Sequence, residues 1–166
     1  MLSVAELLFP EAVYAEAVIS GKREMYEDAF ELERVLREGG ERIVGAEKNE
    51  RAERVLEDTP ALGPGERAAL RVALAREADA VLTDDRAFLG VLAGAGVRAL
   101  VPSAAIVLLA GREVVSVEEA VEALESIEGS VRREVYEAAM EELVGMREER
   151  RLAKRRDRTR CGYRRV

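Results

Sequence analysis

Histidine is absent from this sequence of 166 residues, and cysteine occurs once, as Cys161. These absences exclude a Ser-His-Asp triad, a Cys-His pair, a disulfide framework and a zinc finger built from this chain alone. An acid, a base or a metal ligand must therefore come mainly from carboxylates. Glutamine is also absent and Asn49 is the single asparagine, a composition typical of heat-stable proteins.

Long apolar runs are missing as well. No run approaches the ~18 residues that a membrane-spanning helix needs, and no basic segment followed by an apolar stretch opens the sequence. Apolar residues make up 48% of the chain and charged residues 36%, which is a globular composition. We expect a soluble, cytoplasmic protein.

Positive charge is scarce except at the C-terminus. Residues 147–166 hold ten Arg and Lys against three acids, which leaves 16 basic and 30 acidic residues in the first 146. An Arg-rich segment binds RNA phosphates by releasing counterions, and Tyr163 offers a ring on which a base can stack. Two alternatives remain open: a solvated C-terminus, and docking on the acidic part of another copy.

Helices and strands alternate in the middle of the sequence. Apolar periodicity with Gly and Pro breaks predicts helices over 64–76, 86–93 and 103–109 and strands over 42–44, 80–83 and 98–101. Strands that alternate with helices of about ten residues imply βαβ units and a parallel sheet. We expect an α/β domain over 1–128, followed over 129–166 by a long helix and the basic tail.

The first 40 residues are predicted to be helical. Ser3 and Glu6 form a capping-box pattern that predicts a helical turn ending near Leu8. Pro10 can open a second helix, which Gly21 ends, and a third helix is expected over 23–37.

Glu66 is the first candidate for chemistry. It follows Gly63-Pro64-Gly65 in the first turn of a predicted helix, where free N–H groups and the helix dipole favour an ionised carboxylate. A metal ligand suits that position, and so does a plain helix cap.

Asp84 and Asp85 lie at the carboxyl end of the predicted strand over 80–83, the edge at which open α/β sheets bind ligands. Either residue is also a suitable N-cap for the next helix. Since Glu66 and the Asp pair flank one helix and one strand, they can converge at the same edge. Carboxylates that close together repel one another unless a cation intervenes, and oxygen ligands favour Mg²⁺ or Mn²⁺.

The order of these motifs resembles that of PIN-domain proteins, which include the VapC-type ribonuclease toxins. The likeness runs from about residue 7 to residue 127 and rests on Leu62-Gly63-x-Gly65-Glu66, on Ala80-Val81-Leu82-Thr83-Asp84-Asp85, on Gly96-Val97, and on a P-x-x-V-x-x-E pattern formed by Pro10, Val13 and Glu16.

The resemblance implies a three-layer α/β/α sandwich and a ribonuclease that cuts single-stranded RNA with an acidic cluster and Mg²⁺ or Mn²⁺. In that cluster Glu16, Glu66 and Asp84 match the family's acids, and Asp85 matches a frequent neighbour. An antitoxin protein is then an expected partner. Without the resemblance, Glu16 is explained equally by the solvated face of an acid-rich helix.

One family feature has no counterpart in this sequence. The family's first strand ends in an Asp, whereas Met1–Leu8 contain Glu6 and no Asp. A start site placed too late, a lost strand and a misleading resemblance all remain open. Losing a central strand leaves its neighbours' backbone groups unpaired, so we expect a homodimer to replace it. The alternative function is a PIN-like scaffold that binds RNA or a protein without cleaving RNA.

Overall fold

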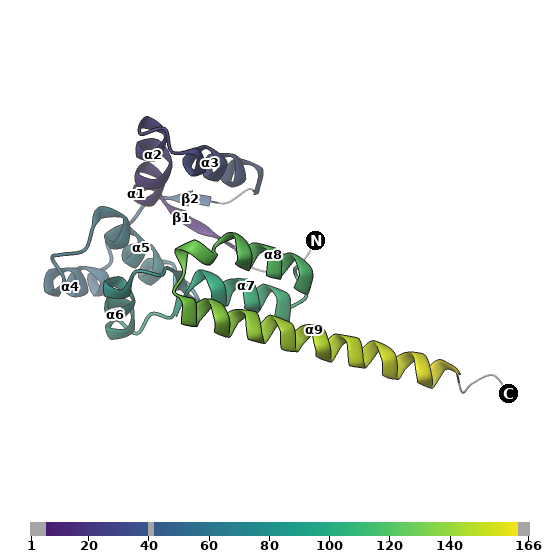
Figure 1. The fold of residues 1–166 in the computed structure, drawn as a ribbon. Helices are drawn as coiled ribbons and strands as arrows, with labels where there is room; N and C mark the ends of the chain where they lie inside the picture. The colour runs from purple at the N-terminus through teal and green to yellow at the C-terminus, as the bar shows by residue number, and fades with distance from the viewer. Residues whose placement is uncertain (1–5, 40–41, 163–166) are drawn as a thin grey trace. The chain divides into compact units, whose positions relative to one another are not determined.

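The computed structural model describes residues 6–39 and 42–162, and the side chains of this part up to residue 153. The chain forms two compact units, Met1–Leu100 and Val101–Val166 (Figure 1). Each unit has its own apolar core, so each is described by itself.

The first unit contains four short strands in two parallel pairs. Strand β1 (Leu8–Pro10) pairs with β2 (Arg42–Val44), and β3 (Val81–Leu82) pairs with β4 (Ala99–Leu100). The predicted α/β class with parallel strands and additional C-terminal helices is confirmed. Both pairs are two-stranded, so within residues 6–39 and 42–162 β1 and β3 each pair along one edge only.

Helices surround these strands in chain order. One continuous helical segment consists of α1 (Glu11–Tyr14), a π-helical stretch η1 (Ala15–Ser20) and α2 (Gly21–Arg23). The others in this unit are α3 (Glu27–Gly39), α4 (Glu50–Asp58), α5 (Pro64–Ala75) and α6 (Arg86–Gly94).

The helical turn predicted to end near Leu8 is wrong at its C-terminal end. Leu8 and Phe9 are strand residues, paired with Arg42 and Ile43, and the rest of that prediction lies partly outside the described residues. Parallel pairing with a distant segment outweighed the local capping pattern. Pro10 is tolerated because it stands at the end of the strand, where its missing N–H costs no pairing inside the strand.

The largest apolar cluster of the first unit joins α4, α5 and α6. Leu70, Phe88 and Leu92 are almost completely buried there, together with Ala52 and Leu56. Helix α5 is central, because it also contacts α1, β1 and β3. The position of α5 is therefore fixed by both strand pairs and by three helices.

The second unit is helical. Helices α7 (Pro102–Gly111) and α8 (Val117–Ser126) form a hairpin that packs on α9 (Arg133–Gly162), with a short 3₁₀ turn η2 (Glu128–Ser130) between α8 and α9. Val107, Leu124 and Leu143 are buried at the centre. Among the described residues, no helix combines the length and apolar character that crossing a membrane requires.

Candidate active site

The start of α5 is built from a tight cap. Gly63 is the extended N-cap residue, Pro64 is at the first helical position, and Glu66 is at the third. The Gly63 N–H donates a hydrogen bond of 2.5 Å to Glu66 Oε2, which is the reciprocal half of a capping box. The cap predicted as an alternative therefore exists. It does not exclude metal binding, since an ionised carboxylate has two oxygens and about four acceptor positions.

Glu16 lies against this same turn. Gly65 is buried, and a Cβ atom added to it would stand 2.9 Å from Glu16 Oε2 and 3.5 Å from Val13 Cγ2. Only a residue without a side chain lets η1 approach α5 so closely. The packing thus places the Glu16 carboxylate beside the residue that directly precedes Glu66, although the two acids are separated by most of the first unit's sequence.

The π-helical stretch sets the position of Glu16. Residues Ala15–Ser20 follow α1 without a break, and Glu16 is in the first turn of the wider helix. Such π-turns occur mostly as single insertions and are frequent at functional sites. The side chain itself is exposed at the surface of the unit.

Asp84 and Asp85 follow β3. Asp85 is the N-cap of α6: its Oδ1 accepts a 2.7 Å hydrogen bond from the Phe88 N–H. Its own N–H donates to Thr83 Oγ1 at 3.3 Å. Asp85 therefore has the capping role that the sequence left open, while Asp84 is exposed at the strand end.

Chain direction puts these groups at one end of the unit. Helix α5 connects to β3 through the short segment 76–80, so the two run in opposite directions and the start of α5 lies at the end where β3 finishes. The structure brings Glu16 to the start of α5, next to Glu66, and leaves Asp84 and Asp85 at the following turn of the same end. Among the described residues, however, no group of three or more Asp, Glu, His or Cys side chains is close enough to hold one metal ion.

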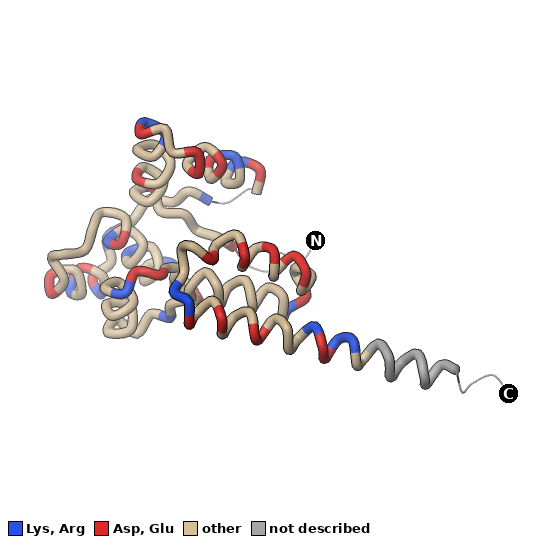
Figure 2. The backbone as a smooth tube through the Cα atoms, viewed as in Figure 1, with Lys and Arg blue, Asp and Glu red and all other residues tan. Residues whose placement is uncertain are grey.

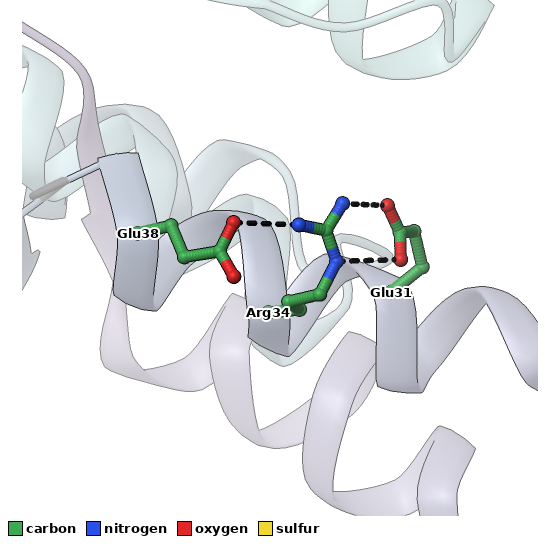
Figure 3. Close-up of polar contacts among 3 residues, drawn as sticks. All are labelled: Glu31, Arg34 and Glu38. Atoms are coloured by element: carbon green, nitrogen blue, oxygen red, sulfur yellow. Dashed lines mark hydrogen bonds and ion pairs between the residues drawn. The ribbon is translucent and has the colours of Figure 1, made fainter.

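Other acids of the first unit are neutralised by neighbouring cations. In α3, Arg34 bridges Glu31 and Glu38 (Figure 3), and its hydrogen bonds to Glu31 lower the pKa of that carboxyl. Lys22 donates to Glu33 at 2.7 Å and likewise lowers its pKa.

Between α4 and α5, Arg71 donates two hydrogen bonds to Glu53, of 2.6 and 3.0 Å, which lower the pKa of Glu53. Within the described part of the chain, no ion pair joins Glu16, Glu66 or Asp84 to a cationic side chain. The donor type of these three carboxylates fits Mg²⁺ or Mn²⁺, while their number gathered at one point falls short of a complete ligand set.

A shallow cavity of about 370 Å³ borders Glu16 on its other side. Its lining includes Ser20, Glu24 and Asp28 as well as Glu16. The sequence analysis did not select Glu24 or Asp28, although the four-residue spacing of Glu16, Ser20 and Glu24 along one helix was a usable signal. An anionic substrate would be repelled from this acidic surface unless a cation lay between them.

Comparison with known proteins identifies the family. A family model described as a PIN domain matches residues 3–144, which is most of the chain. The comparisons with curated proteins and with solved structures found no match. A PIN domain indicates a nuclease-like function in general, in agreement with the carboxylate chemistry at the start of α5. With this match and a parallel-stranded α/β unit, the chain belongs to the PIN-domain family.

Proposed function

We propose that this chain is a metal-dependent endoribonuclease that hydrolyses phosphodiester bonds of single-stranded RNA, with Glu16, Glu66, Asp84 and Asp85 as its acidic site. The observation that carries the proposal is the packing of Glu16 against Gly65, which sets two separately predicted acids at one helix start. Chance placement of two exposed acids does not require a buried glycine between them.

The residues have different parts in this proposal. Glu16 and Glu66 are held by helix packing and by the α5 cap, so they are in place before a ligand arrives. Asp84 is free of the cap that Asp85 provides and contributes a third carboxylate from the neighbouring turn. A bound Mg²⁺ or Mn²⁺ would supply an activated water and charge stabilisation at the phosphate.

Single-turnover cleavage of labelled single-stranded RNA in Mn²⁺ tests this function. Glu66→Gln is informative because Gln at the third helical position keeps the capping hydrogen bond and removes the charge. We expect Glu66→Gln and Asp84→Asn each to lower the cleavage rate by about 100-fold or more, the scale of losing one electrostatic contact to a transition state. Cleavage that survives both substitutions contradicts the site.

Glu119 provides the matched control. It is the third residue of α8 and closes a capping box with Ser116, whose N–H donates to Glu119 Oε2 at 2.7 Å. Glu119→Gln therefore makes the same chemical change in the same local structure. Its cleavage rate should equal that of the unsubstituted chain.

A second candidate is a scaffold that binds RNA or a protein partner without cleavage. The observation in its favour is that no three acids meet at one point in the described residues. The same assay separates the two functions: RNA that is bound but stays intact in saturating Mn²⁺ supports the scaffold and rejects the nuclease.

A homodimer is part of the proposal. The first unit exposes the unpaired edges of β1 and β3 and a group of large apolar side chains on its N-terminal helices, namely Ile19, Met25, Tyr26, Phe30 and Val35. Such surfaces are commonly covered by a partner. Light scattering at micromolar concentration should give the mass of two chains, and a monomer would contradict this expectation.

The more specific form of the function is a toxin of a toxin–antitoxin pair, as the likeness to VapC-type ribonucleases suggests. Induced expression in a bacterial host should then arrest growth, and Glu66→Gln at equal protein level should relieve the arrest. Equal growth inhibition by both proteins would reject a toxic ribonuclease activity.

A further inference from the structure

Helix α9 changes character along one seam. Tyr136, Met140 and Leu143 follow one another at alternating spacings of four and three residues, and all three contact the core of the second unit. This is the spacing of a helix face that packs against neighbouring helices. The same alternation continues to Arg147, Arg150 and position 154, where the residue is Lys. The packing face thus turns from apolar to basic after Leu143.

The first two basic residues of the seam still contact the α7–α8 hairpin. Arg147 Nε is 3.3 Å from Glu118 Oε1. Arg150 Nη2 donates a 2.7 Å hydrogen bond to the Ala110 carbonyl, near the end of α7, and lies 3.8 Å from Glu113 Oε1. Both cations are therefore satisfied by anionic groups of the same unit.

Farther along, α9 leaves the hairpin behind. Arg151, Leu152 and Ala153 are exposed, and the helix continues to Gly162. Figure 1 shows α9 extending beyond the α7–α8 hairpin, and Figure 2 shows the change from mixed charges to Lys and Arg along it. This extension lies outside the family match, which ends at residue 144.

Helical geometry places the basic positions on one side. At 3.6 residues per turn, positions 147, 151, 154 and 158 fall within an arc of about 60°, while 156 and 160 fall on the opposite side. All six are Arg or Lys. A helix that needed another apolar neighbour would carry apolar residues on this face, so the face is suited to a polyanion.

We infer that this face of α9, from Arg151 through positions 154 and 158, is a binding site for the phosphate backbone of single-stranded RNA. This inference rests on the proposed function for the choice of RNA as the polyanion. The remainder of the chain, with 30 acids against 16 basic residues over positions 1–146, repels RNA. The basic helix provides the phosphate contacts that this acidic remainder lacks.

Equilibrium binding of a labelled single-stranded oligouridylate to the full chain tests the inference. EDTA is present throughout, so that the result does not depend on cleavage and a failure of the nuclease proposal leaves this test unchanged. Two double substitutions are compared, Lys154→Ala with Arg158→Ala on the proposed face and Arg156→Ala with Arg160→Ala on the opposite face. Each removes two positive charges at four-residue spacing, and Ala preserves the helix.

Substitution on the proposed face should weaken binding and make the dependence of log K on log salt shallower by about 1.4, because each phosphate contact on a single strand contributes about 0.7. The opposite-face pair should leave both quantities near those of the unsubstituted chain. Equal losses in the two pairs, or no loss in either, overturn the inference. So does unchanged RNA affinity accompanied by lost self-association, which assigns the face to another copy of the chain.

Discussion

Gly65→Ala separates the site from the fold. The added Cβ would stand 2.9 Å from Glu16 Oε2, closer than folded proteins tolerate, and 3.5 Å from Val13 Cγ2, which is an ordinary contact. The atom that must move is the end of a flexible side chain. The substitution therefore displaces the Glu16 carboxylate by roughly half an ångström or more and leaves the backbone packing in place.

The expected effects on stability and on cleavage differ. Ala in a helix is favoured over Gly by up to about 1 kcal/mol, which offsets the cost of the crowded contact, so the melting temperature should change by no more than about 4 °C. A misplacement of this order at a catalytic site costs on the order of 100-fold in rate. Thermal denaturation and single-turnover RNA cleavage in Mn²⁺ measure the two quantities.

Gly90→Ala is the matched control. Gly90 lies within α6, and no atom is found within 4 Å of a Cβ built there. This substitution should stabilise the chain by about 0.5–1 kcal/mol and leave cleavage unchanged. If Gly65→Ala cleaves RNA as fast as Gly90→Ala does, Glu16 has no part in the reaction and the reasoning is refuted.

Three further predictions concern the framework of the first unit. Gly96→Ala should cost about 1–2 kcal/mol in chemical denaturation, because φ is +68° there and the new Cβ would meet Arg51 Nη2 at 3.2 Å; no loss contradicts that strain. Leu92→Ala should cost about 2–5 kcal/mol, since the side chain is fully buried. Arg71 lowers the pKa of Glu53, so this pair stabilises the fold above the carboxyl's unfolded pKa and the effect is lost as pH falls through its folded pKa. Arg71→Ala should remove that acid dependence, an effect under about 1 kcal/mol for a partly exposed pair.

Local signals predicted the middle of the chain well. Gly63-Pro64 with Glu66 marked the start of α5, and the structure begins the helix at Pro64. The predicted strands over 80–83 and 98–101 contain β3 and β4, since both are short apolar runs between helices with clear breaks. These features depend on neighbours in sequence, which a single sequence displays.

Features that depend on distant contacts were not predictable. Strand β1 exists because Leu8 and Phe9 pair with β2, and nothing local distinguished this from a helical turn. The third helix begins at Glu27 and not near Arg23, because Met25 adopts a left-handed conformation (φ 61°) without a Gly or Asn to announce it. The approach of Glu16 to Gly65 likewise arises from tertiary packing.

The acidic residues show the same division. Position at a helix start made capping by Glu66 and Asp85 foreseeable, and both hydrogen bonds are present. Their use as metal ligands stays a prediction, because capping and metal binding favour the same residues at the same positions.

Mn²⁺ titration of thermal stability tests most directly whether Glu16 and Glu66 act together. At about 100 times the dissociation constant, a cation bound only to the folded chain adds about 2.7 kcal/mol of stability. If both carboxylates bind one ion, Glu16→Gln and Glu66→Gln should each abolish most of this gain, and the double substitution should add little to either. No stabilisation of the unsubstituted chain, or equal stabilisation of all four proteins, would contradict a shared cation site at the start of α5.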